Sequence, residues 1–525
     1  MKSGDASLRK TLKRLVVPSL FILLVHVGAA RWARPASAGH QPQKESQAAA
    51  DRDWSDADRD RWLVDFQQLI GEMSSHYANL EWAVTARHMD LAALRSATES
   101  KIRSARSEDE ERKILTKFLD AFGDGHLELS WPKESVDSGR PENESPEGKG
   151  ICSRLGYAHR GKVGLNFSLL AKYRPLDDAD SPDFAGGVLK LASGLSVGVI
   201  RIGVFSERGF PDACAEAATK LRLADSGPCD DNCGDQVETA TANILLRKLE
   251  RRAATLRKAG AAYIVLDITQ NGGGSDWVDP VARTLSPVRL QAPRMAFMRH
   301  PHWTQQLQDM LDDIGTDLRN GKSPRDVLER SEKVMQEALR QSKEPCDQAP
   351  LWTDRKPSCS LMVPGLRFPV SVFPYATPGS FRELKSRTKL FYSLRYSYKE
   401  SFNQLPLVVL VDKDTWSAAE YLPAALQDNK AALIVGELTG GAGCGYTNDG
   451  IPTVLRNSRA TVQMPDCIRL RANGSNEVEG ITPDVLVAWT NRDTPFQRVH
   501  KLELALEAAL RKEKATRSGS HAPSN

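Results

Sequence analysis

The feature that most constrains the fold of this chain is a buried strand that leads through a short polar turn to a serine and then a helix. The run LVVLV at 407–411 is apolar and rich in β-branched residues, which is typical of a strand covered on both faces of a sheet. Polar residues follow, then Ser417, and then a stretch from Ala418 that favours a helix. A hydroxyl at such a corner projects from the sheet, and the free N–H groups of the first helical turn can hold negative charge beside it. The segment therefore has the architecture of a nucleophile site.

Ser417 also fits a plain helix N-cap, a position at which serine is common. It does not stand alone, because a second apolar strand at 431–435 and a glycine-rich segment at 436–443 follow it. The G-x-S-x-G elbow of the α/β-hydrolases is absent, since Asp-Thr-Trp-Ser-Ala-Ala stands at 414–419, so that fold is not supported.

Composition limits the class of protein. The chain has 525 residues, of which 40% are hydrophobic and 26% are charged, and this is enough for two or three packed units of an ordinary globular protein. The formal net charge is +4, with acidic and basic residues mixed along the chain. We therefore expect no nucleic-acid partner.

The N-terminus has the order of a secretory signal. Basic residues at 2–14 precede an apolar stretch at 15–30, and the small residues Ala-Ser-Ala at 36–38 follow. Retention as a membrane anchor is the alternative, but the apolar stretch is short and is interrupted by Pro18 and His26. We expect cleavage near Ala38, a secreted or periplasmic protein, and no stable membrane insertion afterwards.

The cysteines agree with an exported chain, because all eight follow the predicted signal and their number is even. Eight cysteines permit on the order of 100 pairings, and the sequence does not choose among them. Proximity favours Cys444 with Cys467 and Cys346 with Cys359. A zinc site at Cys229-x-x-x-Cys233 is the weaker alternative, since no second matching pair exists.

A helical region precedes the core. An apolar stripe from Trp62 to Tyr77 and a capping box that starts at Ser107 predict helices up to the break at Asp124-Gly125-His126. His126 thus lies at the joint between a helix and a short strand. A histidine at such a turn is often only a surface residue, although its near-neutral pKa also suits a general base.

A second glycine-rich loop follows a strand at 263–268, where Gly272, Gly273 and Gly274 are consecutive. Glycines let backbone amides approach a ligand closely, because no Cβ stands in the way. A plain turn is the alternative, and a phosphate-binding role is poorly supported because the P-loop spacing is missing.

Further on, residues 300–342 are charged and helical, and either a lid over a cleft or a structural hairpin fits them. His300 and His302 within this stretch are a poor metal-ligand set.

Three blocks in this order resemble the carboxy-terminal processing (tail-specific) and tricorn-core serine peptidases: Asp-Gly-His at 124–126, Asn-Gly-Gly at 271–273, and Ser-Ala-Ala-Glu at 417–420. The resemblance implies a crotonase/Clp-protease-like ββα superhelix, an α/β core with an N-terminal helical domain and a helical insertion. It also implies a serine endopeptidase that acts on a peptide or protein substrate and needs no cofactor or metal. Because this family includes members that only bind ligands, a catalytically silent binding module is the alternative.

The resemblance also assigns roles to residues of this chain. It makes Ser417 the nucleophile, His126 the general base, and Glu479 the acid that completes a relay with the histidine, in preference to Glu477. The amides of Gly272 or Gly273 and of Ala418 would stabilise the oxyanion.

The base distinguishes two branches of the family. Tail-specific members take the proton with a lysine in a G-K-G block after the next strand, whereas this chain has Ala442 at the matching position. The chain therefore resembles the histidine-using branch, and the sequence shows no convincing PDZ domain. The expected organisation is a signal peptide at 1–38, a loose linker at 39–52, the helical domain at 53–130, the first part of the peptidase core at 131–299, the helical insertion at 300–362, the second part of the core at 363–510, and a disordered tail at 511–525.

Overall fold

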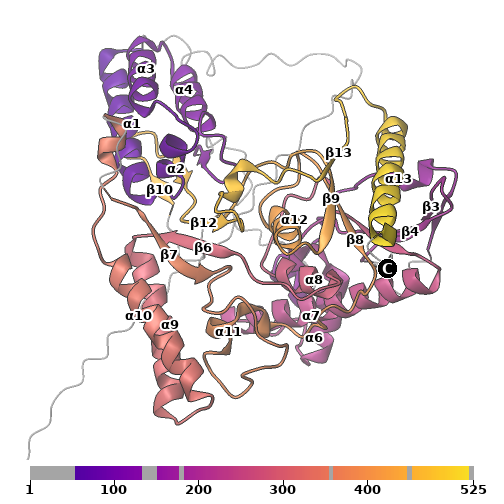
Figure 1. Cartoon of the computed structure of the whole chain (residues 1–525). Coiled ribbons are helices and arrows are strands. Elements are labelled where there is room, and N and C mark those ends of the chain that lie inside the picture. Colours follow the sequence, from indigo (N-terminus) through magenta and orange to yellow (C-terminus); the bar gives the residue numbers. More distant parts are fainter. Residues whose placement is uncertain (1–53, 133–149, 177–182, 354–358, 446–451, 520–525) are drawn as a thin grey trace, which may run out of the picture. The chain divides into compact units, whose positions relative to one another are not determined.

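A computed structural model describes residues 54–132, 150–176, 183–353, 359–445 and 452–519 (Figure 1). The predicted signal peptide at 1–38 and the predicted linker at 39–52 both lie outside these residues. The largest sheet has seven strands in the order β13-β9-β8-β5-β4-β3-β2. Neighbours from β13 to β4 run parallel, and β3 and β2 add to the sheet antiparallel. The strands are β2 (Tyr173–Pro175), β3 (Gly186–Lys190), β4 (Ser196–Arg201), β5 (Tyr263–Asp267), β8 (Leu407–Val411), β9 (Ala432–Gly436) and β13 (Val485–Leu486).

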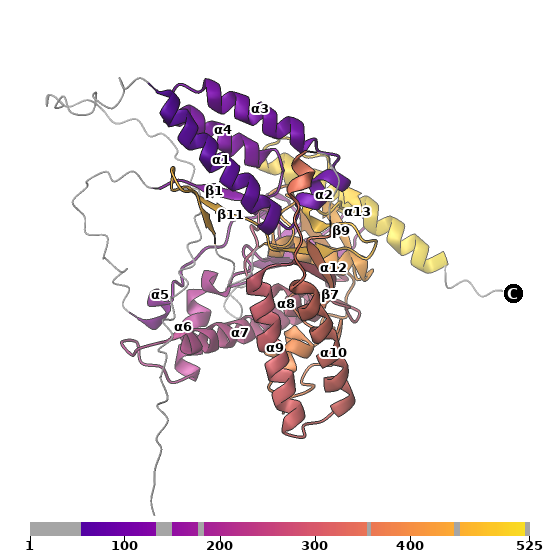
Figure 2. The same ribbon diagram turned by 90° about the vertical axis from the view of Figure 1, so that its left-hand side faces the viewer.

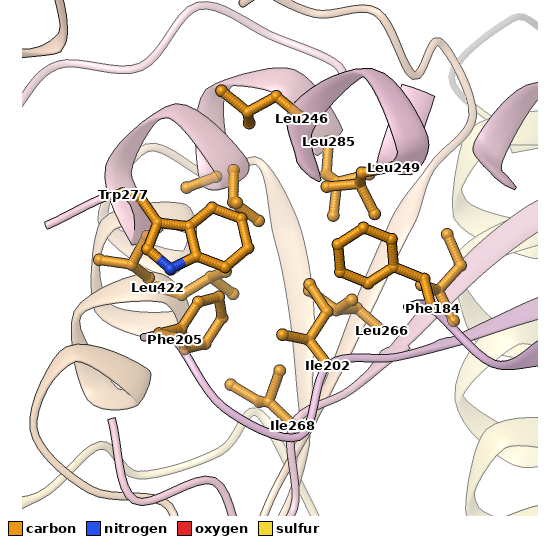
Figure 3. Close-up of a cluster of buried hydrophobic side chains, with 14 of the residues drawn as sticks. Phe184, Ile202, Phe205, Leu246, Leu249, Leu266, Ile268, Trp277, Leu285 and Leu422 are labelled. Atoms are coloured by element: carbon orange, nitrogen blue, oxygen red, sulfur yellow. The ribbon is translucent and has the colours of Figure 1, made fainter. Parts of the chain in front are cut away.

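Helices cover both faces of this sheet, as the continuous apolar runs predict. In β5, Ile264 and Leu266 pack with one group of helices, whereas Tyr263 and Val265 face the other side, toward the C-terminal helix. Figure 3 shows the first of these cores, in which Trp277 lies among aliphatic and aromatic side chains. The helices are α6 (Pro211–Lys220), α7 (Asp231–Lys258), α8 (Val278–Leu285) and α12 (Ala418–Asp428) on one face and α13 (Pro495–Gly519) on the other.

The N-terminal region is helical, as predicted, and its core includes a small antiparallel sheet whose strands come from both ends of the chain (Figure 2). Ser107 begins one of its helices as the N-cap, because its hydroxyl accepts a hydrogen bond from the Glu110 N–H. The elements are α1 (Asp56–His76), α2 (Leu80–Thr85), α3 (Leu91–Ser104), α4 (Glu108–Asp120), β1 (Glu128–Ser130), β10 (Thr453–Val454) and β11 (Thr461–Gln463).

A third core joins a helical hairpin to an antiparallel sheet with the order β12-β6-β7. Figures 1 and 2 both show the two helices of the hairpin side by side. The elements are β6 (Arg294–Met298), α9 (Pro301–Arg319), α10 (Arg325–Ser342), β7 (Met362–Arg367) and β12 (Cys467–Leu470).

The remaining elements are short. They are α5 (Ile151–Arg154), α11 (Arg387–Leu390) and the 3-10 turns η1 (Phe167–Leu169), η2 (Glu207–Gly209), η3 (Ala349–Trp352), η4 (Tyr392–Arg395) and η5 (Glu477–Glu479). The predicted fold class, an α/β core with an N-terminal helical region and a helical insertion, is confirmed. Within the described ranges, none of the helices combines the length and the apolar character that crossing a membrane requires.

All eight cysteines form disulfides, which confirms the prediction of paired cysteines. Both pairings that proximity favours are present, Cys444 with Cys467 and Cys346 with Cys359. The other two bonds join Cys152 to Cys214 and Cys229 to Cys233. The short Cys229–Cys233 bond spans the N-cap of α7, where Asp230 accepts a hydrogen bond from the Cys233 N–H, so it closes the first turn of a helix instead of binding zinc.

Candidate active site

Ser417 lies at the corner between β8 and α12, where the sequence places it. Its backbone has φ 57° and ψ −120°, a conformation that L-residues rarely adopt. Such strain is retained only where the surrounding structure over-determines it, and it often marks a functional corner. The helix begins at the next residue, and the Ala418 N–H has no acceptor among the described residues. The hydroxyl therefore projects from a strained turn beside a free amide.

The glycine loop after β5 packs directly against this corner. A Cβ on Gly273 would lie 2.7 Å from the Trp416 carbonyl oxygen and 2.8 Å from the Ser417 Cβ, so only glycine fits there, and its φ of +96° also favours glycine. The Gly273 N–H donates to the Asn271 side chain at 2.9 Å. Gly272 is exposed, and its N–H has no acceptor in the described part of the chain. Of the two predicted amides, Gly272 is thus the one left free to bind a ligand.

His126 reaches Ser417 from the N-terminal helical region. Its Nε2 lies 3.0 Å from the Ser417 Oγ, although 291 positions separate the two residues in the sequence. The backbone of His126 is held by Asp124, whose carboxylate accepts the His126 N–H at 3.0 Å as well as bonds from Tyr77 and Asn79. Burial raises the pKa of Asp124 to about 6, against the effect of these hydrogen bonds. The Asp-Gly-His block thus carries both an anchor and the imidazole.

The glycine of this block has a steric reason. A Cβ on Gly125 would lie 2.4 Å from the ring of Trp416, which is the residue before the serine. The indole Nε1 donates to the Lys413 carbonyl at 2.8 Å and so holds the ring at this place. Glycine at position 125 therefore allows the histidine loop and the serine corner to approach each other.

The tautomer of His126 follows from its partners. Its Nδ1 lies 2.7 Å from the Ala442 carbonyl oxygen, which can only accept, so Nδ1 carries the proton and Nε2 accepts the Ser417 hydroxyl. Burial lowers the pKa of His126, and the Ala442 carbonyl opposes this effect. The imidazole is consequently neutral near pH 7 and ready to take a proton from the serine.

A buried carboxylate connects the serine corner to the segment that holds His126. Glu420 is 0% exposed and lies three residues after Ser417. Its Oε2 accepts the N–H groups of Ser417 at 2.9 Å and of Ala442 at 2.8 Å. Its Oε1 accepts the Gly441 N–H at 2.8 Å and the Thr439 hydroxyl at 2.6 Å. One carboxylate therefore fixes the backbone of Ser417 and of Ala442, each of which contacts the imidazole.

The structure does not bring Glu479 to the histidine, and the predicted relay needs correction at this residue. The Glu479 side chain is 42% exposed, and its Oε1 accepts bonds from the Trp82 indole and the Arg87 guanidinium. The tight turn η5 directs it away from the imidazole, while Glu477 on the same turn is fully buried. A shift of two residues along η5 thus separates an exposed carboxylate from a buried one.

Glu477 is linked to the nucleophile through an arginine. Arg469 Nε donates to Glu477 Oε2 at 2.6 Å, and Arg469 Nη2 donates to the Ser417 carbonyl at 2.9 Å. Burial raises the pKa of Glu477, and the charge of Arg469 opposes this. Both side chains are almost completely buried. The pair therefore holds the strained serine corner through the Ser417 carbonyl oxygen.

The two histidines of the insertion lie close to each other and to a carboxylate. The Nδ1 atoms of His300 and His302 lie 2.6 Å apart, and His302 Nε2 lies 2.9 Å from Asp466 Oδ2. No group of three or more His, Cys, Asp or Glu side chains within the described ranges has the arrangement of a metal site.

Comparison with known proteins shows which family part of this chain is similar to. Residues 327–487, which contain Ser417, Glu420 and Glu477, match the model of peptidase family S41. The segment that contains the serine corner is thus similar to peptidase family S41. His126 and the glycine loop at 272–274 lie outside the matched segment. For these residues, the observation that places them in the site is their contact with the Ser417 corner.

Other proteins match this chain over part or most of its length. A protein of Chlamydia muridarum (strain MoPn / Nigg), described as uncharacterized, is 30% identical over 105 residues, which is 18% of this chain and 17% of that protein. The chain thus aligns with only about a sixth of that curated relative. The crystal structure of mature CPAF has a TM-score of 0.51 at 16% identity and covers 86% of this chain and 96% of CPAF. Mature CPAF complexed with lactacystin gives 0.50 at 15% identity, covering 86% and 98%. At these identities the likeness establishes the fold.

Sequence reasoning missed Glu420, Arg469 and the Ala442 carbonyl as parts of the site. The glutamate of Ser-Ala-Ala-Glu stood in the motif, and its place as the third residue of the helix that follows the serine was the available signal. The Ala442 contact uses a main-chain oxygen, which leaves no side-chain signature in a sequence.

Proposed function

We propose that this chain is an exported serine endopeptidase in which Ser417 is the nucleophile and His126 the general base. The observation that carries the proposal is the 3.0 Å contact between Ser417 Oγ and His126 Nε2, with Nδ1 held at 2.7 Å by a carbonyl oxygen. A hydroxyl is a weak nucleophile until a positioned base takes its proton, and this pair has the required geometry and tautomer.

The reaction would begin when Ser417 Oγ attacks the scissile carbonyl carbon and His126 Nε2 takes the hydroxyl proton. The negative oxygen of the tetrahedral intermediate would accept the N–H groups of Ala418 and Gly272, both without an acceptor among the described residues. His126 would then protonate the leaving amine, and the acyl-enzyme would be hydrolysed by water with the same histidine as base. Gly273, the other predicted amide, would serve by its close packing against Ser417.

The imidazolium that forms during the reaction would keep its Nδ1 against the Ala442 carbonyl oxygen, which lies 2.7 Å away. The Ala442 carbonyl would stabilise it by a hydrogen bond, and Glu420 would act as a positioning residue that holds Ala442 in place through its N–H. In this proposal Glu479 has no part in the relay, since its carboxylate bonds with Trp82 and Arg87.

Export and the substrate are also part of the proposal. Four disulfides favour an oxidising compartment, because thiols in the cytosol are kept reduced. The substrate would be a peptide or protein. Purification of the secreted form and intact-mass measurement would give a chain that begins near Gly39 and has no free thiol; eight free thiols would contradict export.

Peptide hydrolysis by site variants tests the proposed chemistry. Ser417→Ala should lose on the order of 10⁶ in kcat with little change in the urea-unfolding midpoint. His126→Ala should lose nearly as much, since the two residues act as a unit. Near-normal turnover by Ser417→Ala would exclude the assignment, and an inactive wild-type chain would favour the ligand-binding module.

A further inference from the structure

A basic cavity lies apart from the residues of the proposed active site. It has a volume of about 900 Å³ and is formed between α7 and the segment 378–399, which includes α11 and η4. Its cationic side chains are Arg247, Arg251, Arg382, Arg387, Arg395 and Lys399.

The lining of this cavity has an unbalanced charge. Glu250 is the one carboxylate in the lining, and Lys399 already pairs with it at 2.9 Å. Arg395 donates to the Thr239 hydroxyl at 3.1 Å, with Asp235 at 3.8 Å. The chain as a whole carries only +4 with its charges interspersed, so this concentration of one sign is local.

Three of the guanidinium groups are available for a ligand. Arg251, Arg382 and Arg387 are exposed, and within the described residues their side chains form no hydrogen bond or ion pair. Arg247 is also exposed, and its charge acts on Glu216, which itself pairs with Lys220 at 2.6 Å. Like charges around one hollow repel one another, and a concave surface of a single sign attracts and concentrates the opposite charge.

We infer that the basic cavity binds a compact polyanion that carries two or more phosphate or sulfate groups. Its volume falls within the roughly 300–1,000 Å³ of small-molecule sites, which favours a compact ligand over an extended acidic peptide. Guanidinium groups bind the oxygens of phosphate through two parallel N–H bonds, and arginines on both walls allow more than one such contact. A soluble phosphate compound and a phosphorylated lipid headgroup share this chemistry.

This inference does not depend on the proposed peptidase activity. The Ser417→Ala variant should bind the polyanion as the wild type does, so a failure of the catalytic proposal and a failure of this one are separate results.

Isothermal titration calorimetry with inorganic tripolyphosphate tests the basic cavity on the purified full chain. The double variant Arg382→Ala/Arg387→Ala should bind at least about tenfold more weakly, since hydrogen bonds to charged groups contribute strongly. Wild-type binding should weaken as the ionic strength rises toward about 0.15 M. Thermal unfolding of the variant should be unchanged, because both side chains are exposed.

The matched control is Arg103→Ala/Arg456→Ala, which removes the same charge from two exposed arginines outside the cavity. Flotation with phosphatidylcholine vesicles that carry phosphatidylinositol bisphosphate tests the lipid source. If only the Arg382→Ala/Arg387→Ala variant loses binding to tripolyphosphate or to the vesicles, the result supports the inference. The probe whose binding is lost then shows whether the ligand is a soluble phosphate compound or a lipid headgroup. Equal losses in both double variants, no loss in either, or binding of polyglutamate but of neither phosphate probe would overturn it.

Discussion

Replacing Glu420 by glutamine tests whether Glu420 is the carboxylate that holds the site, in place of Glu479, which the sequence favoured. In Glu420→Gln an amide replaces a buried carboxylate that accepts four hydrogen bonds, three of them from backbone N–H groups. The amide oxygen can still accept the bonds of Ser417 and Ala442. Its NH₂ group can donate to Thr439 if that hydroxyl rotates, but it then faces the Gly441 N–H, which loses its acceptor.

The magnitude follows from that count. One orphaned buried N–H costs about 1–3 kcal/mol, and loss of the charge weakens the remaining bonds, so we expect a destabilisation of about 2–4 kcal/mol. The loop that contains Ala442 should shift, and a displacement on the order of 1 Å can cost about 100-fold in rate. We therefore expect kcat/KM to fall about 100-fold at a temperature where the variant is still folded.

The matched variant is Glu479→Gln, whose side chain is 42% exposed and bonds with Trp82 and Arg87. It should keep kcat/KM within about threefold of wild type, since single exposed ion pairs contribute about 1 kcal/mol or less. Urea unfolding gives the stability of both variants, and peptide hydrolysis gives their activity. A larger activity loss in Glu479→Gln than in Glu420→Gln would refute the reasoning and restore the relay.

Three further predictions concern the surroundings of the serine. Because burial lowers the pKa of His126 below 6.5 and only the neutral imidazole accepts a proton, kcat/KM should fall as the pH drops through an ionisation below 6.5; a pH profile with this ionisation above 6.5 would contradict it. Gly273→Ala should cost about 100-fold or more in kcat/KM, since its Cβ would lie 2.7 Å from a carbonyl oxygen, whereas Gly272→Ala, with open space around its Cβ, should fold with unchanged stability in thermal unfolding. Replacing Cys444 and Cys467 together by serine should destabilise the chain by about 3 kcal/mol in urea unfolding, as expected for a closed loop with a separation of 23, and an unchanged midpoint would be evidence against this tether.

The parts of the fold and site that the sequence predicted are those with local signals. The strand–serine–helix corner and the glycine loop after β5 each follow from a run of neighbouring residues, and both lie where expected. The paired cysteines followed from their even number and from the predicted signal. The contact of His126 with Ser417 crosses most of the chain, so only the resemblance of short motifs could suggest it.

The parts that the sequence did not predict depend on tertiary packing or on main-chain atoms. Glu477 and Glu479 differ in burial because a tight turn points them in different directions, and no periodicity fixes the direction of a side chain in such a turn. Arg469 reaches the Ser417 carbonyl from β12, which is 52 positions away. The carbonyl that orients His126 belongs to the main chain of Ala442, and any residue type at this position would supply one. The sequence therefore carries no sign of its role.

The most direct test of the central claim is labelling with a fluorophosphonate, which reacts with a serine whose hydroxyl is activated by a base. The purified chain is incubated with the probe, digested, and the modified residue is located by mass spectrometry, with Ser417→Ala and His126→Ala treated in parallel. We predict that the wild type carries a single label on Ser417, that Ser417→Ala carries none, and that His126→Ala reacts far more slowly. A label on a different serine, or wild-type labelling of Ser417 in His126→Ala, would contradict the proposed pair.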